Sequence, residues 1–336
     1  MNAKEWIKST IRGFMCVSGI LGNNWLGFCS LPKSRSQLRT NNILFINLAI
    51  SNLITNYMVD LPDTLELVKR WPVGRMYCSA FNFFSDLSET SSIFTTMFIT
   101  VFWHQKLVGS LKHGGAPVQM DNTRLVMALL AGSWTVSVVF SLPHLFFTSL
   151  NIQNQSSEEC LEYFPSQEVK QTYEMVFLML ANVVPIVGIV FASIQITVTL
   201  LQSQKRIKNI SSRAGPRGDD QRKAASNELS SKDYISNATS ANAPNTIQKV
   251  QKSQDRSNSS SGSSQVRAAK SVVAVATVFV ICWLTHLLLS ITSTIHDSIV
   301  IHEMTSYIGA LYTCIIPYIY LYGVKKLTCL TCSSID

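Results

Sequence analysis

The chain has 336 residues, of which 47% are apolar and only 14% are charged. Soluble globular domains carry about 25% charged residues, so the composition argues against a soluble protein. The charge lies between long apolar stretches, as in chains that place segments in lipid, where an ionised side chain is costly. The net charge of +8 resides in connecting segments, which indicates membrane orientation rather than a nucleic-acid partner.

Seven stretches are long and apolar enough for a helix that crosses a bilayer, which needs about 20 residues. They cover residues 11–31, 42–62, 77–104, 124–147, 172–201, 270–294 and 303–323. They are too long and too uniformly apolar for barrel strands, and only helices or closed barrels satisfy their backbone in lipid. The sequence therefore predicts an all-α membrane protein, a seven-transmembrane helix bundle of the plasma membrane.

The first stretch follows three basic residues, Lys4, Lys8 and Arg12, and no small-residue cleavage site stands out. We therefore expect the first helix to act as its own insertion signal. Lys and Arg in the short loops favour an N-terminus outside the cell and a C-terminus in the cytoplasm. The basic N-terminal tail disagrees mildly with this orientation.

The spans divide the chain into four parts. Residues 1–201 hold the first five helices with short loops, and residues 270–323 hold the last two. Residues 202–269 are rich in Ser, Asn, Gln and Lys and nearly lack aromatic side chains, which predicts a disordered cytoplasmic loop. Its serines are compatible with phosphorylation or with a passive tether. Residues 324–336 are expected to form a short cytoplasmic tail.

The cysteines and glycosylation sequons fit this topology. Cys78 begins the third helix and Cys160 lies in the loop between the fourth and fifth, both on the oxidising side, so we expect a disulfide between them; the alternative is two free thiols. Asn154 is the one Asn-x-Ser/Thr sequon that the topology exposes to glycosylation. Cys329 and Cys332 follow the last helix and fit palmitoylation and unmodified thiols equally well.

Short motifs occur in order along the expected helices. They are Gly22-Asn23, Asn47 to Leu53, Trp71-Pro72-Val73-Gly74 with Cys78, Trp134, Pro185, Phe279 to Trp283, and Pro317 to Tyr320. Together they cover nearly the whole chain, which resembles the class A, rhodopsin-like G-protein-coupled receptors. The resemblance implies an extracellular ligand, a heterotrimeric G protein as partner and no cofactor.

Four positions depart from that family's pattern. Asn52 stands where the second helix usually has a sodium-binding Asp, so the usual sodium-linked polar core is expected to be absent. Phe102-Trp103-His104 replaces the Asp-Arg-Tyr triplet that usually ends the third helix. Thr285 replaces a proline of the sixth helix, and Ile316 replaces an asparagine of the seventh. This pattern is similar to vomeronasal type-1 receptors and fish olfactory receptors related to class A. The similarity implies a chemosensory receptor for an odorant or pheromone-like molecule, signalling through a G protein of the inhibitory class.

Polar side chains in the outer half of the bundle are candidates for ligand contact, because ionisable groups inside a membrane are costly and usually functional. They are Asp86 and Glu89 on the third helix, Glu174 on the fifth, His286 on the sixth, and Tyr307 and Tyr312 on the seventh. Structural hydrogen bonds are the alternative for the acids, and a core position for the histidine. Amine receptors of class A carry an Asp at the position of Ser85, which counts against an aminergic receptor.

Trp283, Pro317 and Tyr320 are candidate switch residues, with plain helix packing as the alternative. No metal site is expected. The spans contain no motif such as H-E-x-x-H or G-x-S-x-G, so we do not expect an enzyme. The absence of an internal repeat makes a transporter the weaker interpretation. A bitter-taste-type receptor, or a class A receptor for another small ligand or a peptide, stays as an alternative.

Overall fold

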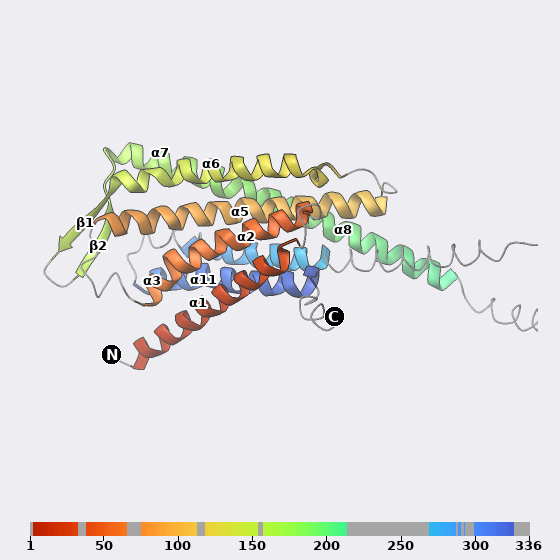
Figure 1. Ribbon diagram of the computed structural model, residues 1–336, viewed down its shortest axis with the longest axis horizontal. Helices are drawn as coiled ribbons and strands as arrows, with labels where there is room; N and C mark the ends of the chain where they lie inside the picture. The colour runs from red at the N-terminus through yellow and green to blue at the C-terminus, as the bar shows by residue number, and fades with distance from the viewer. Residues whose placement is uncertain are drawn as a thin grey trace, which may run out of the picture.

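The computed structural model describes residues 3–32, 38–65, 75–112, 118–153, 157–213, 269–286, 288–289, 292 and 299–325. Within these ranges, seven helical segments lie side by side as an elongated bundle (Figure 1). They are α1 Ala3–Ser30; α2 Thr40–Thr55 with η2 Asn56–Asp60 and α3 Leu61–Thr64; α5 Arg75–Lys112; α6 Thr123–Phe147; α7 Gln167–Phe177 with η4 Leu178–Val183 and α8 Val184–Arg213; the helix Ala269–His286; and α11 Ile299–Tyr320 with η5 Leu321–Lys325.

The predicted all-α membrane bundle is confirmed, and the expected spans correspond to these segments in order. α1 ends at Ser30, one residue before the expected end of the first span. For the expected span 270–294, the continuous described helix ends at His286, and most of the remaining residues lie outside the described part. Four of the segments are long and apolar enough to cross a membrane: Thr40–Thr64, Thr123–Phe147, Gln167–Arg206 and Ala269–His286. α8 continues to Arg213, beyond the expected end at residue 201. The start of the segment that was expected to be a disordered loop is therefore helical, and residues 214–268 lie outside the described residues.

α5 lies at the centre of the bundle and packs against α6, α8 and α2, while α1 packs against α2 and α11 (Figure 1). The outer surface of α1 is apolar: Phe14, Val17, Leu21, Trp25 and Phe28 are exposed on it. Their spacing of three or four residues places them on one face of the helix. Such a face suits contact with lipid, as a membrane span requires.

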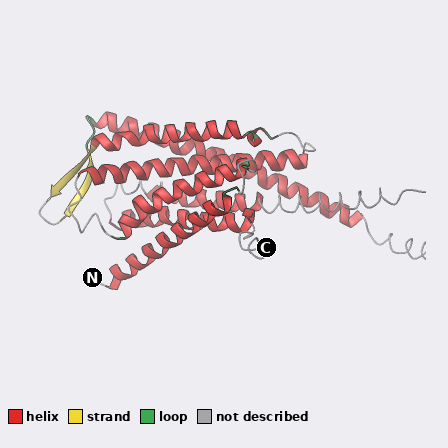
Figure 2. Ribbon diagram, in the orientation of Figure 1, coloured by secondary structure: helices red, strands yellow, loops and turns green. Residues whose placement is uncertain are grey.

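A β-hairpin caps one end of the bundle and contains the only strands among the described residues (Figure 2). β1 Thr148–Gln153 pairs antiparallel with β2 Ser157–Glu162, placing Leu150 opposite Cys160, and β1 packs against α5. We call this end of the bundle the hairpin end. Cys78 is disulfide-bonded, and its predicted partner lies on β2, where side chains are outside the described part. Asn154 also lies outside it.

Two helices contain a π-helical turn just before a proline, which the sequence analysis did not predict. η2 precedes Pro62 and η4 precedes Pro185. A proline has no N–H for the carbonyl four residues earlier and its ring crowds that carbonyl, and a wider turn accommodates the mismatch. Each π-turn adds a residue to its turn, so it changes which side chains of the preceding helix face the bundle.

One amide joins three helices in the middle of the bundle. The Trp134 Nε1 of α6 donates to the Asn47 Oδ1 of α2 at 2.9 Å. The Asn47 Nδ2 donates in turn to the Thr95 Oγ1 of α5 at 2.7 Å. Both ends of the asparagine amide are satisfied, which fixes the rotation of α2 and thereby the position of the polar residues further along it.

Candidate ligand-binding and switch site

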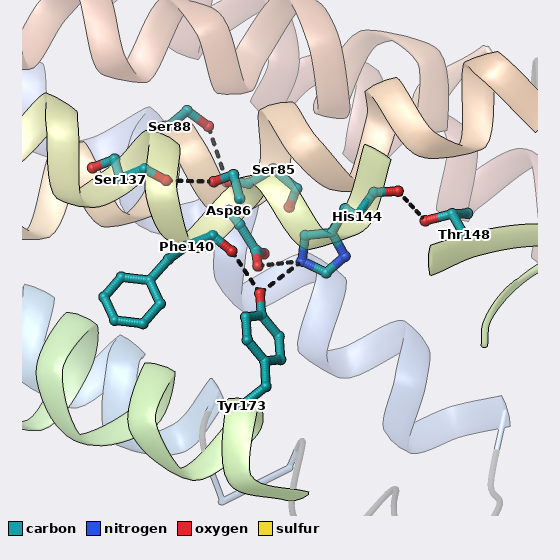
Figure 3. A network of polar contacts seen from close by, with 9 residues as sticks. Ser85, Asp86, Ser88, Ser137, Phe140, His144, Thr148 and Tyr173 are labelled. Carbon is teal, nitrogen blue, oxygen red and sulfur yellow. Dashed lines mark hydrogen bonds and ion pairs between the residues drawn. The ribbon is translucent and has the colours of Figure 1, made fainter. Parts of the chain in front are cut away.

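Asp86 forms a partly buried hydrogen-bonded group with residues of α6 and α7 near the hairpin end (Figure 3). Its Oδ2 lies 2.7 Å from the His144 Nε2, and the side chains are 22% and 8% exposed. The Tyr173 hydroxyl lies 3.4 Å from the same nitrogen and donates to the Phe140 carbonyl at 2.6 Å. We call Asp86, His144 and Tyr173 the Asp86 group; it connects α5, α6 and α7.

Aromatic rings surround the Asp86 group. The ring contacts join Phe140 with Phe177 at 5.6 Å, Phe147 with Phe164 at 5.1 Å, Phe164 with Tyr173 at 5.4 Å, and Tyr173 with Phe177 at 6.1 Å between centroids. A hydrogen bond to a carboxylate is stronger in such an apolar setting than in water. The surroundings therefore strengthen the connection between the three helices.

Glu89 lies one turn further along α5 than Asp86 and is half-buried. It interacts electrostatically with Asp86 and with Tyr312 of α11. Among the residues that the structure describes, however, it has no hydrogen-bond or ion-pair partner. Asp86 and Glu89 are both ligand candidates in the sequence analysis, but in the structure they have different surroundings.

A row of rings follows along the helix Ala269–His286. His286 stacks on Trp283 with centroids 5.1 Å apart, and Trp283 stacks on Phe279 at 6.4 Å. Phe279 meets Tyr312 edge-on at 5.7 Å. The predicted ligand residue His286 thus contacts the predicted switch residue Trp283 directly, and Tyr312 is connected to Trp283 through Phe279.

Replacing Trp283 with alanine is expected to lower the maximal G-protein response to an activating ligand by about fivefold or more, because it removes the ring between His286 and Phe279. The amount of receptor at the cell surface, measured by antibody labelling of intact cells, should change far less. Trp25→Ala, on the exposed face of α1, is the matched control. A loss of surface receptor that accounts for the whole loss of response would support plain packing instead.

The core beneath these rings is polar, and a chain of neutral groups runs through it. The Tyr312 hydroxyl donates to the Ser92 Oγ at 2.8 Å, and Ser92 donates to the Asn52 Oδ1 at 2.9 Å. The Asn52 Nδ2 donates to the Asn23 Oδ1 at 3.0 Å, and the Asn23 Nδ2 donates to the Thr313 carbonyl at 3.1 Å. The network joins α11, α5, α2 and α1, so a polar core persists although the usual acid of the second helix is absent.

Tyr307 lies near the hairpin end but contacts α1. The Arg12 guanidinium sits 4.9 Å from its ring centroid, and the Tyr307 hydroxyl donates to the Lys8 carbonyl at 3.5 Å. Arg12 also pairs with Asp63 at 2.6 Å. Tyr307 is therefore part of a contact between α1, α3 and α11, whereas Tyr312 belongs to the core.

Glu174 lies on the surface of α7. Its side chain is 55% exposed and lies 3.7 Å from the Lys170 ammonium in the same helix. Its neighbour Tyr173 occupies the inward position and joins the Asp86 group. The structure does not bring Glu174 together with the other predicted ligand residues.

The switch candidates of α11 are packed against α1 and α2. Tyr320 is fully buried, and its ring lies 4.8 Å from that of Phe45. Its hydroxyl has no hydrogen-bond partner among the described residues. At the same far end, Lys106 lies 5.0 Å from the Phe102 ring and 5.9 Å from the Trp103 ring. These cation–π contacts occupy the place of the family's arginine.

Five polar residues of this region were missed by the sequence analysis: His144, Tyr173, Arg12, Asp60 and Asp63. The sequence contained a signal for His144, because a single histidine in an apolar span needs a polar partner. Asp60 accepts from the Asn56 Nδ2 at 2.8 Å. No group of three His, Cys, Asp or Glu side chains suited to a metal ion occurs in the described part of the chain.

Residues 23–320 match the model of the 7 transmembrane receptor (rhodopsin family). The chain therefore belongs to the rhodopsin family of seven-transmembrane receptors, which are multi-pass signalling receptors of the plasma membrane and not enzymes. Such a receptor works with an extracellular ligand and a G protein.

Similar proteins include receptors for several kinds of ligand. The chain is 25% identical to melatonin receptor type 1A-A of Danio rerio over 61% of its length. It is 23% identical to galanin receptor type 1 of Rattus norvegicus over 64%, and 27% identical to neuropeptide CCHamide-1 receptor of Drosophila melanogaster over 60%. The matches span 57%, 60% and 41% of these relatives' own lengths.

Proposed function

We propose that this receptor is chemosensory: it binds a small odorant or pheromone-like molecule within the half of the bundle at the hairpin end, which faces outside. The main support is the contact between predicted ligand and switch residues, where His286 stacks on Trp283 at 5.1 Å. A ligand shifts a receptor only by binding its two states with different affinity. A ligand in contact with these rings has a direct route to such a difference.

The chemosensory part of the proposal is supported by the departures from the family pattern. Asn52 lies in a network of neutral groups, and Trp103 is buried where the usual arginine would be. Both features are similar to the vomeronasal type-1 receptors and the fish olfactory receptors related to class A. We propose a G protein of the inhibitory class on the same basis.

A cell assay tests the proposed function. Cells expressing the full chain are exposed to small acids, amines, steroids and aromatics, and a fall in cyclic AMP is recorded beside cells without the receptor. We expect responses to a subset of these molecules, abolished when inhibitory G proteins are inactivated. Activation by peptides alone would overturn the proposal, and responses that survive this inactivation would overturn the G-protein class.

A peptide receptor is the second candidate. It is favoured by the relatives named for galanin and for the neuropeptide CCHamide-1. Under this alternative, peptides activate the receptor in the same assay and the small molecules do not. The two candidates are therefore separated by one screen.

A further inference from the structure

The two acids in the hairpin-end half of α5 differ in their partners. Asp86 is bound by the His144 Nε2 at 2.7 Å, within a group that joins three helices. Glu89 has no such partner among the described residues, although it interacts electrostatically with Asp86 and Tyr312. Within the described part of the chain, Asp86 therefore has a basic partner and Glu89 has none.

Three basic side chains that the structure describes near this end are each paired with another acid. The pairs are Arg12 with Asp63 at 2.6 Å, His144 with Asp86 at 2.7 Å, and Lys170 with Glu174 at 3.7 Å. None of these three basic side chains is available to Glu89 without losing its present partner. A counter-charge for Glu89 must therefore come from outside this set.

Glu89 also faces the interior of the bundle. It lies about 21 Å along α5 from Arg75, at a rise of about 1.5 Å per residue, and α5 is surrounded by α2, α6 and α8. Ser88 and Thr90 beside it are buried, yet Glu89 keeps accessible surface. Ser92, one turn further along the same side of α5, accepts from the Tyr312 hydroxyl at 2.8 Å, and Tyr312 meets Phe279 edge-on. Glu89 therefore lies on the side of α5 that faces the ring row. The carboxyl group is thus partly accessible and lies on the side of α5 that carries the aromatic rings.

A carboxylate without a partner is costly inside a membrane bundle. A group that brings a positive charge to it offsets that cost, and aromatic rings nearby favour both an apolar body and a cation. We propose that Glu89 binds the protonated amine of a small ligand with an apolar body, whereas Asp86 is a positioning residue that holds α5, α6 and α7 together. This inference rests on the proposed function.

The test uses probes that differ in one group. Phenethylamine, tryptamine and cyclohexylmethylamine are each compared with the matched alcohol and carboxylic acid in the cyclic AMP assay. We expect at least one amine to activate the receptor at lower concentration than its alcohol and acid. Glu89→Gln should raise the active concentration of that amine about 10- to 100-fold without lowering the surface amount, and Glu89→Asp, which keeps the charge, should lose less.

Asp86→Asn is the matched comparison. It should lower the surface amount and the thermal stability of the purified receptor, and combining it with His144→Ala should add little, because both changes break the same bond. Amine potency per surface receptor should change much less than in Glu89→Gln. If Asp86→Asn and Glu89→Gln changed amine potency equally, the proposed roles of Asp86 in positioning and Glu89 in ligand binding would be contradicted.

The outcomes separate this inference from the proposed function. If acids or neutral molecules activate the receptor and none of the amines does, the inference is overturned while a small-molecule receptor stands. An amine response that Glu89→Gln leaves unchanged also overturns it. If only peptides activate the receptor, both the proposed function and the inference fail.

Discussion

Replacing Asn52 with leucine is expected to destabilise the folded receptor by about 2–6 kcal/mol, because each buried partner left without a hydrogen bond costs about 1–3 kcal/mol. The Asn52 amide is fully buried, donates to Asn23 at 3.0 Å and accepts from Ser92 at 2.9 Å. Leucine has a similar volume but can do neither. The measurement is the thermal unfolding of purified receptor in detergent, together with its surface amount in cells.

Asn24→Leu supplies the control for this change. Asn24 is exposed on the neighbouring helix and donates only to the Ile20 carbonyl of its own helix at 2.8 Å. Its replacement should alter stability by no more than about 0.5 kcal/mol. Similar losses at both positions would mean that the buried network contributes little beyond the general effect of an asparagine in a span.

Replacing Gly22 with valine is the second change with a large expected effect. A Cβ at this position would lie 2.8 Å from the Pro317 Cγ and 3.0 Å from the Tyr318 Cε2, both in rings that cannot rotate away freely. α1 and α11 must therefore move apart, at a cost of about 1–3 kcal/mol. The Tyr318 hydroxyl, which donates to the Ser18 carbonyl at 2.9 Å, should lose this contact. Thermal unfolding and surface labelling measure the loss.

Gly132→Val controls for adding a branched side chain to a membrane helix. A Cβ at Gly132 meets nothing within 4 Å. Valine there should therefore leave stability nearly unchanged. The proposed close approach of α1 and α11 would be refuted by a Gly22→Val receptor that unfolds at the same temperature as the Gly132→Val receptor.

The fold followed from hydropathy because lipid contact imposes one simple demand on each span. The same measure missed the end of α8, where residues 202–213 are polar but include Gln, Lys and Arg, which are good helix formers. It also missed the hairpin, whose strands are too short and polar to stand out from a loop. Hydropathy therefore located the lipid-facing lengths of the helices but not their ends.

The face of α7 shows why the site was predicted only in part. Tyr173 points inward and Glu174 outward, and consecutive residues of a helix differ in direction by about 100°. The π-turn η4 adds a residue between these positions and Pro185, so counting back from the proline gives the wrong face. A backbone irregularity of this kind depends on packing around it and leaves little trace in local sequence.

The partners of predicted residues were harder to foresee than the residues themselves. Asp86 and Glu89 were singled out because acids are rare inside membranes, but 58 positions separate Asp86 from His144. The loss of the usual acid at Asn52 predicted the absence of a sodium-linked core. It did not predict that the amide would be shared between Asn23 and Ser92, since that depends on the rotation of α2 against α1 and α5.

The hydroxyls and amides that connect Tyr312, Ser92, Asn52 and Asn23 carry no net charge. Salt acts on proteins mainly by screening charges and by occupying ionic sites, and these four side chains offer neither a charge to screen nor an anionic ligand for a cation. The equilibrium between the states of this core should therefore be set by packing and hydrogen-bond geometry. We expect these hydrogen bonds to hold unchanged in fluids of very different salinity.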